Sequence, residues 1–168
     1  MAISHTISDF LIDNDIDYHV YPHRYAEGAI ETARASHVNA HQLAKAVVLV
    51  AERDRYRKYY LAVVPADHVI DFDELRGRTF EPVKLAKEYE LTVLFPDCAV
   101  GAVPILGEAY GLHTFVDESL CERNSKIFFE AGDHEELICI SADQFQRVMG
   151  EAEFAKFSRP DQLSNVQH

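Results

Sequence analysis

Nine histidines are the first residues of this sequence that could do chemistry, because imidazole binds metals and transfers protons near neutral pH. His37 and His41 lie four residues apart, a spacing that would place both side chains on one face of a helix. The chain has no H-E-x-x-H motif and no acidic third ligand at a diagnostic spacing. The pattern therefore predicts no metal site, and ordinary surface or partly buried histidines are expected.

Nucleophilic catalysis has little support in the sequence. A G-x-S-x-G elbow, a P-loop and a dinucleotide fingerprint are all absent, so no cofactor is expected. Cys98 could act as a nucleophile beside a histidine, but a small buried thiol that fills space is the favoured interpretation. Cys98, Cys121 and Cys139 are scattered without a C-x-x-C pair, which favours reduced thiols and a cytoplasmic location.

Lys45 is a stronger candidate, because it opens the apolar stretch KAVVLVA. A lysine beside apolar positions must either extend its ammonium group to water or occupy a pocket with a task. Spacing alone leaves both alternatives open. A second unusual feature is the segment 97–112, DCAVGAVPILGEAYGL, which is rich in glycine and almost uncharged.

Charge limits the class of partner. The net charge of -12 argues against a broad basic face that coats nucleic acid, so DNA binding is not expected. The best local basic cluster is Arg53, Arg55, Arg57 and Lys58, and its simpler interpretation is a solvated hairpin tip. The N-terminus lacks the basic region and apolar run of a signal peptide, and no stretch reaches the length of a membrane span.

The elements that must position these groups alternate between strand and helix patterns. A hydrophobic content of 48% over 168 residues is enough for one domain with its own core. Strands are expected at residues 17–21, 45–51, 58–65, 114–116, 125–130 and 137–140. Helices are expected from Ser4 or Thr6 to Asn14, and at 29–37, 71–77, 85–95 and 141–149. Neighbouring strands favour antiparallel pairing. We therefore expect a single compact α+β domain at residues 1–150, with a mixed, largely antiparallel sheet flanked by helices, and a polar C-terminal tail at 151–168.

Five sequence blocks follow one another in a distinctive order: QLAKAVVL, LAVVPADHVIDFDEL, LFPDCAVGAVP, YGLHTFVDESL and FFEAGDHEELICI. In this order the chain resembles the YbaK/EbsC family of aminoacyl-tRNA editing domains, which also occur inserted in or associated with bacterial prolyl-tRNA synthetases. The resemblance runs over residues 23–149. It implies a compact α+β fold and hydrolysis of the ester that joins a wrong amino acid to the terminal ribose of a tRNA.

The resemblance also implies site residues. The lysine that opens a strand after the second helix in the family is Lys45 here, the G-x-x-x-P loop falls on residues 101–105, and the AG-x-H turn falls on 131–134. Ile105 replaces the last proline of that loop, and a proline remains one place earlier, which puts the shape of the pocket wall in question. The predicted catalytic residues are Lys45 and Gly101, and the predicted substrate-binding residues are Ala102, Val103, Pro104, Ile105, Gly132 and His134.

The implied chemistry needs no strong nucleophile, because an aminoacyl ester is already activated. Such a site needs a positioned water, donors for the developing oxyanion and a wall that limits the size of the side chain. The implied partner is the acceptor end of a mischarged tRNA, with weak contacts from Arg53 and Arg55, and prolyl-tRNA synthetase or an elongation factor as further candidates. Two alternatives stay open: a binding module of the same fold without catalysis, and a metal- or cysteine-dependent hydrolase.

Overall fold

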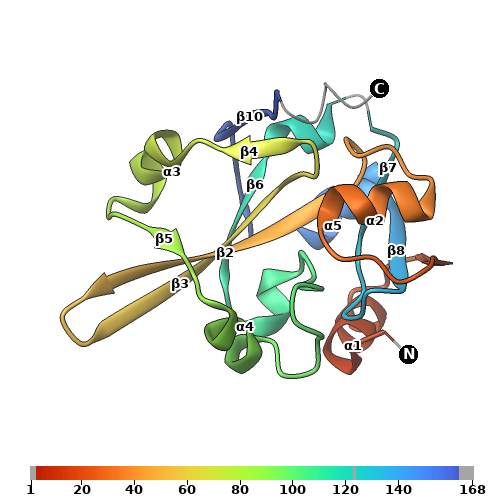
Figure 1. Cartoon of the computed structure of the whole chain (residues 1–168), viewed down its shortest axis with the longest axis horizontal. Helices are drawn as coiled ribbons and strands as arrows, with labels where there is room; N and C mark the ends of the chain where they lie inside the picture. The colour runs from red at the N-terminus through yellow and green to blue at the C-terminus, as the bar shows by residue number, and fades with distance from the viewer. Residues whose placement is uncertain (1–2, 123, 163–168) are drawn as a thin grey trace.

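A long β-hairpin runs through the centre of the computed structural model, which describes residues 3–122 and 124–162 (Figure 1). It is formed by β2 (Ala44–Arg53) and β3 (Tyr56–Pro65), which pair antiparallel along their whole length. Asp54 takes a positive φ of 51° in the tight connection, a conformation that Asp tolerates better than most residues. The apolar, β-branched runs that predicted these strands are therefore confirmed as the centre of the fold.

The strands of the described chain form three sheets, and the hairpin belongs to the largest of them. The largest has the order β5-β2-β3-β6-β9 and is mixed, because β3–β6 and β6–β9 are parallel while the other pairs are antiparallel. A three-stranded antiparallel sheet has the order β1-β8-β7, and β10 pairs with β4. The remaining strands are β1 (His19–Pro22), β4 (His68–Ile70), β5 (Lys84–Leu85), β6 (His113–Asp117), β7 (Lys126–Glu130), β8 (Glu136–Ser141), β9 (Glu153–Ala155) and β10 (Ser158–Pro160).

Five α-helices and two short 3-10 helices flank the sheets in the described ranges. They are α1 (His5–Asp13), α2 (Ala29–Ser36), α3 (Phe72–Thr79), α4 (Glu88–Leu94), α5 (Ala142–Val148), η1 (Gly107–Tyr110) and η2 (Glu118–Cys121). This arrangement confirms the predicted α+β class and single compact domain, although the strands divide among three sheets. No helix in the part of the chain that the structure describes has the length and hydropathy of a membrane span.

Alternate residues of β2 face two different hydrophobic cores. Ala44 and Val48 belong to the main core, which also takes in α1 and α5. Leu49 and Ala51 belong to a second core around α3 and β6. Successive side chains of a strand point to opposite faces, so Lys45 lies on the face of the second core.

Capping residues explain where the helices begin. The Ser4 hydroxyl accepts a hydrogen bond from the Ile7 amide at the start of α1, as predicted. Asp71 caps α3 in the same way. The prediction that Gly77 ends α3 is wrong, because the helix continues to Thr79 and ends where Phe80 adopts a left-handed conformation.

The segment after Gly150 differs from the expected polar tail. Within the described residues, β9 adds a parallel edge strand beside β6, and β10 pairs with β4. Phe157 between them is 1% exposed, and its amide donates to the buried carboxylate of Asp117 at 2.8 Å. Because this segment is mostly polar, its few buried side chains could not be recognised in the sequence. The structured part of the domain extends past residue 150. Residues 163–168 of the expected tail lie outside the described residues.

Candidate functional site

The glycine-rich segment 97–112 is held by hydrogen bonds at its start. The Asp97 carboxylate accepts from the Thr6 amide at 3.0 Å and from the Tyr110 hydroxyl at 2.9 Å. Burial works against the charge of Asp97, but these hydrogen bonds outweigh it and hold its pKa at about 2. The Ala99 amide donates to the Gly132 carbonyl at 2.8 Å. The segment is therefore tied both to α1 and to the turn at residues 131–134.

His134 lies directly against the glycine segment. Its Nε2 is 2.6 Å from the Val100 carbonyl oxygen, and because a carbonyl only accepts, we assign the proton to Nε2. A Cβ atom at Gly101 would lie 3.4 Å from Cε1 of the same ring, and Gly101 has a φ of +83°. The structure therefore brings together Gly101 and His134, two of the residues predicted from the sequence. In this tautomer Nδ1 is an acceptor, and it is buried without a hydrogen-bond partner among the described residues.

The predicted substrate-binding residues after Gly101 are mostly inside the protein. Ala102 and Ile105 have no exposed surface, and Val103 is 9% exposed. Ile105 packs in the main core, and the Ala102 amide donates to the Ala99 carbonyl at 3.0 Å. Pro104 is also buried. Gly101 is the exposed residue of this run, so its backbone is what a ligand can reach here.

Gly132 occupies a place where no side chain fits. A Cβ atom there would lie 2.9 Å from Cβ of Ser4, and the residue has a φ of +104°. Both facts require glycine, since other residues rarely adopt this backbone conformation. The AG-x-H turn, the start of α1 and the glycine segment thus meet at one point.

Glu130, which precedes this turn, was not predicted from the sequence. Burial raises its pKa to about 8, a hydrogen bond from Thr32 partly offsets this, and the charge of Asp133 adds to it. One carboxyl oxygen accepts from the Thr32 hydroxyl at 3.3 Å, and the other is buried without a hydrogen-bond partner in the described chain. Thr32 lies on α2, nearly a hundred residues away in sequence, so no local pattern could reveal this contact. Glu130 carries a proton at neutral pH beside the candidate site.

Cys98 is not activated as a nucleophile. Burial raises the pKa of its thiol to about 11, and its sulfur lies 3.3 Å from the Tyr110 hydroxyl. The thiolate is the reactive form, so the neutral thiol of Cys98 is a poor nucleophile at pH 7. This disfavours a cysteine-dependent hydrolase and supports the interpretation of Cys98 as a space-filling residue.

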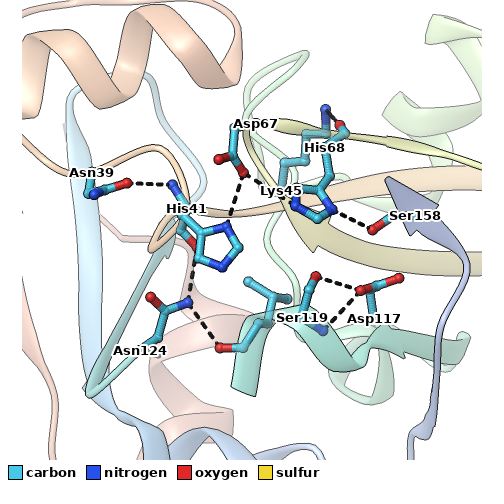
Figure 2. Close-up of polar contacts among 10 residues, drawn as sticks. Asn39, His41, Lys45, Asp67, His68, Asp117, Ser119, Asn124 and Ser158 are labelled. Atoms are coloured by element: carbon cyan, nitrogen blue, oxygen red, sulfur yellow. Dashed lines mark hydrogen bonds and ion pairs between the residues drawn. The ribbon is translucent and has the colours of Figure 1, made fainter. Parts of the chain in front are cut away.

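Lys45 is half-buried and has a specific partner. Its Nζ donates to the His68 carbonyl oxygen at 2.7 Å (Figure 2). Burial lowers its pKa, and the charges of Asp161 and Asp67 partly oppose this effect. Lys45 lies on the second-core face of the five-stranded sheet, whereas Val103 and Ile105 pack in the core on the other face. The fold therefore brings Gly101 and His134 together, while the hydrogen-bond partner of Lys45 is His68 on β4.

A family comparison matches most of the sequence. The profile of the aminoacyl-tRNA editing domain matches residues 23–148. The chain belongs to this family. The matched range contains both the glycine segment and the turn at His134, as well as Lys45. Comparison with curated proteins gives no significant match.

Solved structures share the fold of this editing domain. The crystal structure of hypothetical protein APE2540 gives a TM-score of 0.79 at 20% identity, covering 92% of this chain and 100% of that one. A candidate trans-editing enzyme for prolyl-tRNA synthetase gives 0.75 at 21% identity, with 94% and 99% covered. A candidate signal transduction protein from Marinobacter aquaeolei VT8 gives 0.71 at 16% identity, with 94% of this chain but only 31% of that one covered. At such identities these likenesses show the fold alone.

The basic hairpin tip of this editing domain is smaller than its sequence suggests. Arg57 forms ion pairs with Glu52 at 3.1 Å and Glu90 at 2.7 Å. Arg53 and Arg55 are exposed at the tip, which projects from the body of the molecule (Figure 1). Arg53 lies eight positions after Lys45 on β2, a distance of roughly 26 Å along an extended strand. The tip could therefore contact only a part of a tRNA that lies far from any part bound near Lys45.

A cavity of about 290 Å³ lies at the other end of the glycine segment. Its lining is mostly apolar and includes Leu106, Leu112, Val148 and Met149, with Glu108 and Glu151 as acidic members. Neither Lys45 nor His134 lines it. The editing domain thus has a concave region, away from the Gly101–His134 pair, that sequence reasoning did not identify.

Three possible metal ligands gather near Lys45, although the sequence predicted no metal site. One ligand atom each from His41, Asp67 and His68 lies within 4.8 Å of the others. Figure 2 shows the three side chains converging beside Lys45. The hairpin register explains this proximity: Ala44 pairs with Pro65, so residues shortly before β2 must lie beside residues shortly after β3.

Proposed function

We propose that this editing domain is a trans-acting aminoacyl-tRNA deacylase that hydrolyses the ester of a mischarged tRNA. The observation that carries the proposal is the match of residues 23–148 to the aminoacyl-tRNA editing domain. A small amino acid on tRNA for proline is the proposed substrate, supported by the shared fold of a candidate trans-editing enzyme for prolyl-tRNA synthetase. The reaction requires no metal and no cofactor.

The proposed reaction is the attack of water on the ester carbonyl carbon. An oxyanion forms, the bond to the ribose oxygen breaks, and that oxygen takes up a proton while the free amino acid leaves. The rate depends on positioning and on donors directed at the oxyanion. Gly101 supports this role because its backbone is exposed and has no side chain to keep an ester away.

His134 acts as a positioning residue in this proposal. Its Nε2 proton holds the Val100 carbonyl, and its ring packs against Gly101. Loss of this ring would free the loop at the residue where the ester binds. The buried residues from Ala102 to Ile105 support the loop from behind, so a change there alters its shape without direct contact to substrate.

Lys45 is proposed to hold the end of the tRNA. Its ammonium group has three N–H donors, of which the His68 carbonyl takes one. Its place on the opposite face of the sheet from the buried part of the glycine segment favours contact with a phosphate or the terminal ribose over contact with the ester carbonyl. A cation that is only half-buried can meet a phosphate at low desolvation cost.

The test is a deacylation panel. The full-length protein is incubated with tRNA for proline charged with alanine, cysteine, serine or proline, and release of the amino acid is followed over time. We expect hydrolysis of at least one mischarged ester in preference to the proline ester. Lys45→Ala should lower the rate by at least about 10-fold, the effect of roughly 1.4 kcal/mol, whereas the exposed Lys126→Ala should leave it unchanged. Full activity in Lys45→Ala would refute the role given to Lys45, and no hydrolysis of any ester would refute the deacylase.

A second candidate function is a binding module of the same fold without catalysis. Ile105 at the position of the family proline and the net charge of -12 motivate it. It predicts that a small amino acid or an aminoacyl-adenylate analogue binds with no turnover of any ester. Measured turnover by the purified chain excludes this candidate.

A further inference from the structure

We propose that His41, Asp67 and His68 form a Zn²⁺ site at the open end of the β2–β3 hairpin. The ligand set is two imidazole nitrogens and one carboxylate oxygen, with a fourth position left for water. Such a set with one open position is typical of zinc in proteins. The site adjoins Lys45, but the proposal does not rest on the proposed deacylase reaction.

The distances between the ligand atoms suit a tetrahedral ion. His41 Nδ1 lies 3.3 Å from Asp67 Oδ1, and His68 Nε2 lies 3.9 Å from the same oxygen. Zinc–nitrogen and zinc–oxygen bonds of about 2.0–2.1 Å place two tetrahedral ligands about 3.3 Å apart. The His41–Asp67 edge already has this length, and the His68–Asp67 edge must shorten by about half an ångström. The third edge, between the two histidines, is at most 4.8 Å and must shorten by up to about 1.5 Å. His68 is buried, so rotation of the half-buried His41 and Asp67 side chains would supply these shifts.

The second nitrogen of His68 has the partner that a zinc-bound imidazole needs. His68 Nδ1 lies 2.9 Å from the Ser158 hydroxyl oxygen on β10. A proton on Nδ1 that is donated to this oxygen leaves the lone pair of Nε2 directed toward Asp67. Hydrogen bonds of this kind orient the ring and set its tautomer in zinc proteins.

The backbone around the three ligands is held in place by hydrogen bonds. The Ala66 amide is shared between the Ala40 carbonyl at 3.2 Å and the Leu43 carbonyl at 2.8 Å, which joins the His41 loop to the Asp67 turn. The Asn124 side-chain amide donates to the His41 carbonyl at 3.0 Å (Figure 2). These contacts do not use the ligand atoms, so the site is organised before any ion binds. Such support is what separates a built site from a chance cluster.

The surroundings decide which cation fits and how strongly. Two imidazoles favour Zn²⁺, Co²⁺ or Ni²⁺ over Mg²⁺ and Ca²⁺, which prefer oxygen ligands. The ammonium group of Lys45, bound to the His68 carbonyl, opposes a second cation, while the carboxylates of Asp67 and Asp161 act in its favour. The side chains of His41 and Asp67 are 28% and 30% exposed, so an ion and its water can enter.

The test uses the untagged full-length chain, because a histidine tag would bind zinc. We expect calorimetry to show one Zn²⁺ per chain, and Co²⁺ to give the visible absorption bands of a tetrahedral site. His41→Gln and Asp67→Asn should each weaken binding by at least about 100-fold, since loss of an outer contact alone costs 10–100-fold. His19→Gln, a change of an exposed histidine on β1, is the matched control and should bind as the unaltered chain does.

Two further measurements complete the test. Zn²⁺ should raise the melting temperature of the unaltered chain and of His19→Gln, but not that of His41→Gln, and Mg²⁺ should raise none of them. Lys45→Met should bind Zn²⁺ more tightly, because a neighbouring positive charge is removed. Zinc binding that is equally strong in His41→Gln, Asp67→Asn and the unaltered chain would overturn the proposal, as would the absence of stoichiometric binding.

Discussion

Glu130 should make the stability of this protein depend on pH between about 4.5 and 8. Its carboxyl group has a pKa of about 8 in the folded protein, against 4.5 for an ordinary glutamate. Below 4.5 the group is protonated in both the folded and the unfolded chain and makes no difference. As the pH rises to 8, the unfolded chain loses this proton and the folded chain keeps it, so ionisation favours unfolding and stability falls.

The size of this effect follows from the pKa difference. Each pKa unit corresponds to 1.36 kcal/mol, so a full shift from 4.5 to about 8 amounts to about 5 kcal/mol. At pH 7 only part of the interval between the two pKa values has been crossed, and partial access of water to the carboxyl group lowers the free-energy difference. We therefore expect about 2–3 kcal/mol at pH 7 relative to pH 4.5.

Glu130→Gln isolates this contribution, because glutamine has nearly the same shape and cannot ionise. The free energy of unfolding in urea is measured for both chains between pH 4.5 and pH 8, and the difference between them cancels the titration of all other groups. The variant should match the unaltered chain near pH 4.5 and become more stable by about 2–3 kcal/mol at pH 7. Glu88→Gln, at an exposed position of α4, is the control and should give a difference within about 0.5 kcal/mol. Parallel profiles for Glu130→Gln and the unaltered chain would refute the reasoning.

Two other predictions concern the glycine segment and the hairpin tip. Gly101→Ala and Gly111→Ala each place a side chain at positive φ and should each cost about 1 kcal/mol of stability, measured by urea unfolding. Only Gly101→Ala, whose new methyl group would lie where the ester is proposed to bind, 3.4 Å from Cε1 of His134, should also lower deacylation; equal activity in both variants would contradict the site. Arg53→Glu and Arg55→Glu should weaken tRNA binding at low salt and reduce its salt dependence. A flat salt dependence in the unaltered chain would instead indicate that prolyl-tRNA synthetase or an elongation factor supplies the affinity.

The sequence predicted those parts of the fold that depend on local chemistry. Ser4, Asp71 and Ser141 each cap a helix as expected, because their side chains bond to amides within the next three residues. Strands β2 and β3 were predicted from continuous apolar runs. Strand β4 has only three residues, too few for an alternating pattern to be seen, and it was missed.

The candidate site was predictable only in part. The contact between Gly101 and His134 follows from a family resemblance, since no spacing rule joins residues so far apart. The face of β2 on which Lys45 lies could not be read from the sequence, because the residues around it are apolar on both sides of the strand. The proximity of His41 and His68 could have been found from the hairpin: a turn placed at Asp54 makes these two residues face one another. Assigning that turn precisely requires backbone geometry that the residues RDRYR do not specify.

The strands contributed by residues 153–160 also affect when the protein can fold. β9 completes the edge of the five-stranded sheet, and β10 pairs with β4, a partner about ninety residues earlier in the chain. A nascent chain that has emerged only to the end of the family match, residue 148, has all of α1–α5 but leaves β4 and β6 without these neighbours. Parallel and long-range pairings form late, because the intervening chain must first be ordered. During synthesis the domain therefore exposes two open sheet edges until residue 160 has left the ribosome, and this is the interval in which it depends most on protection from aggregation.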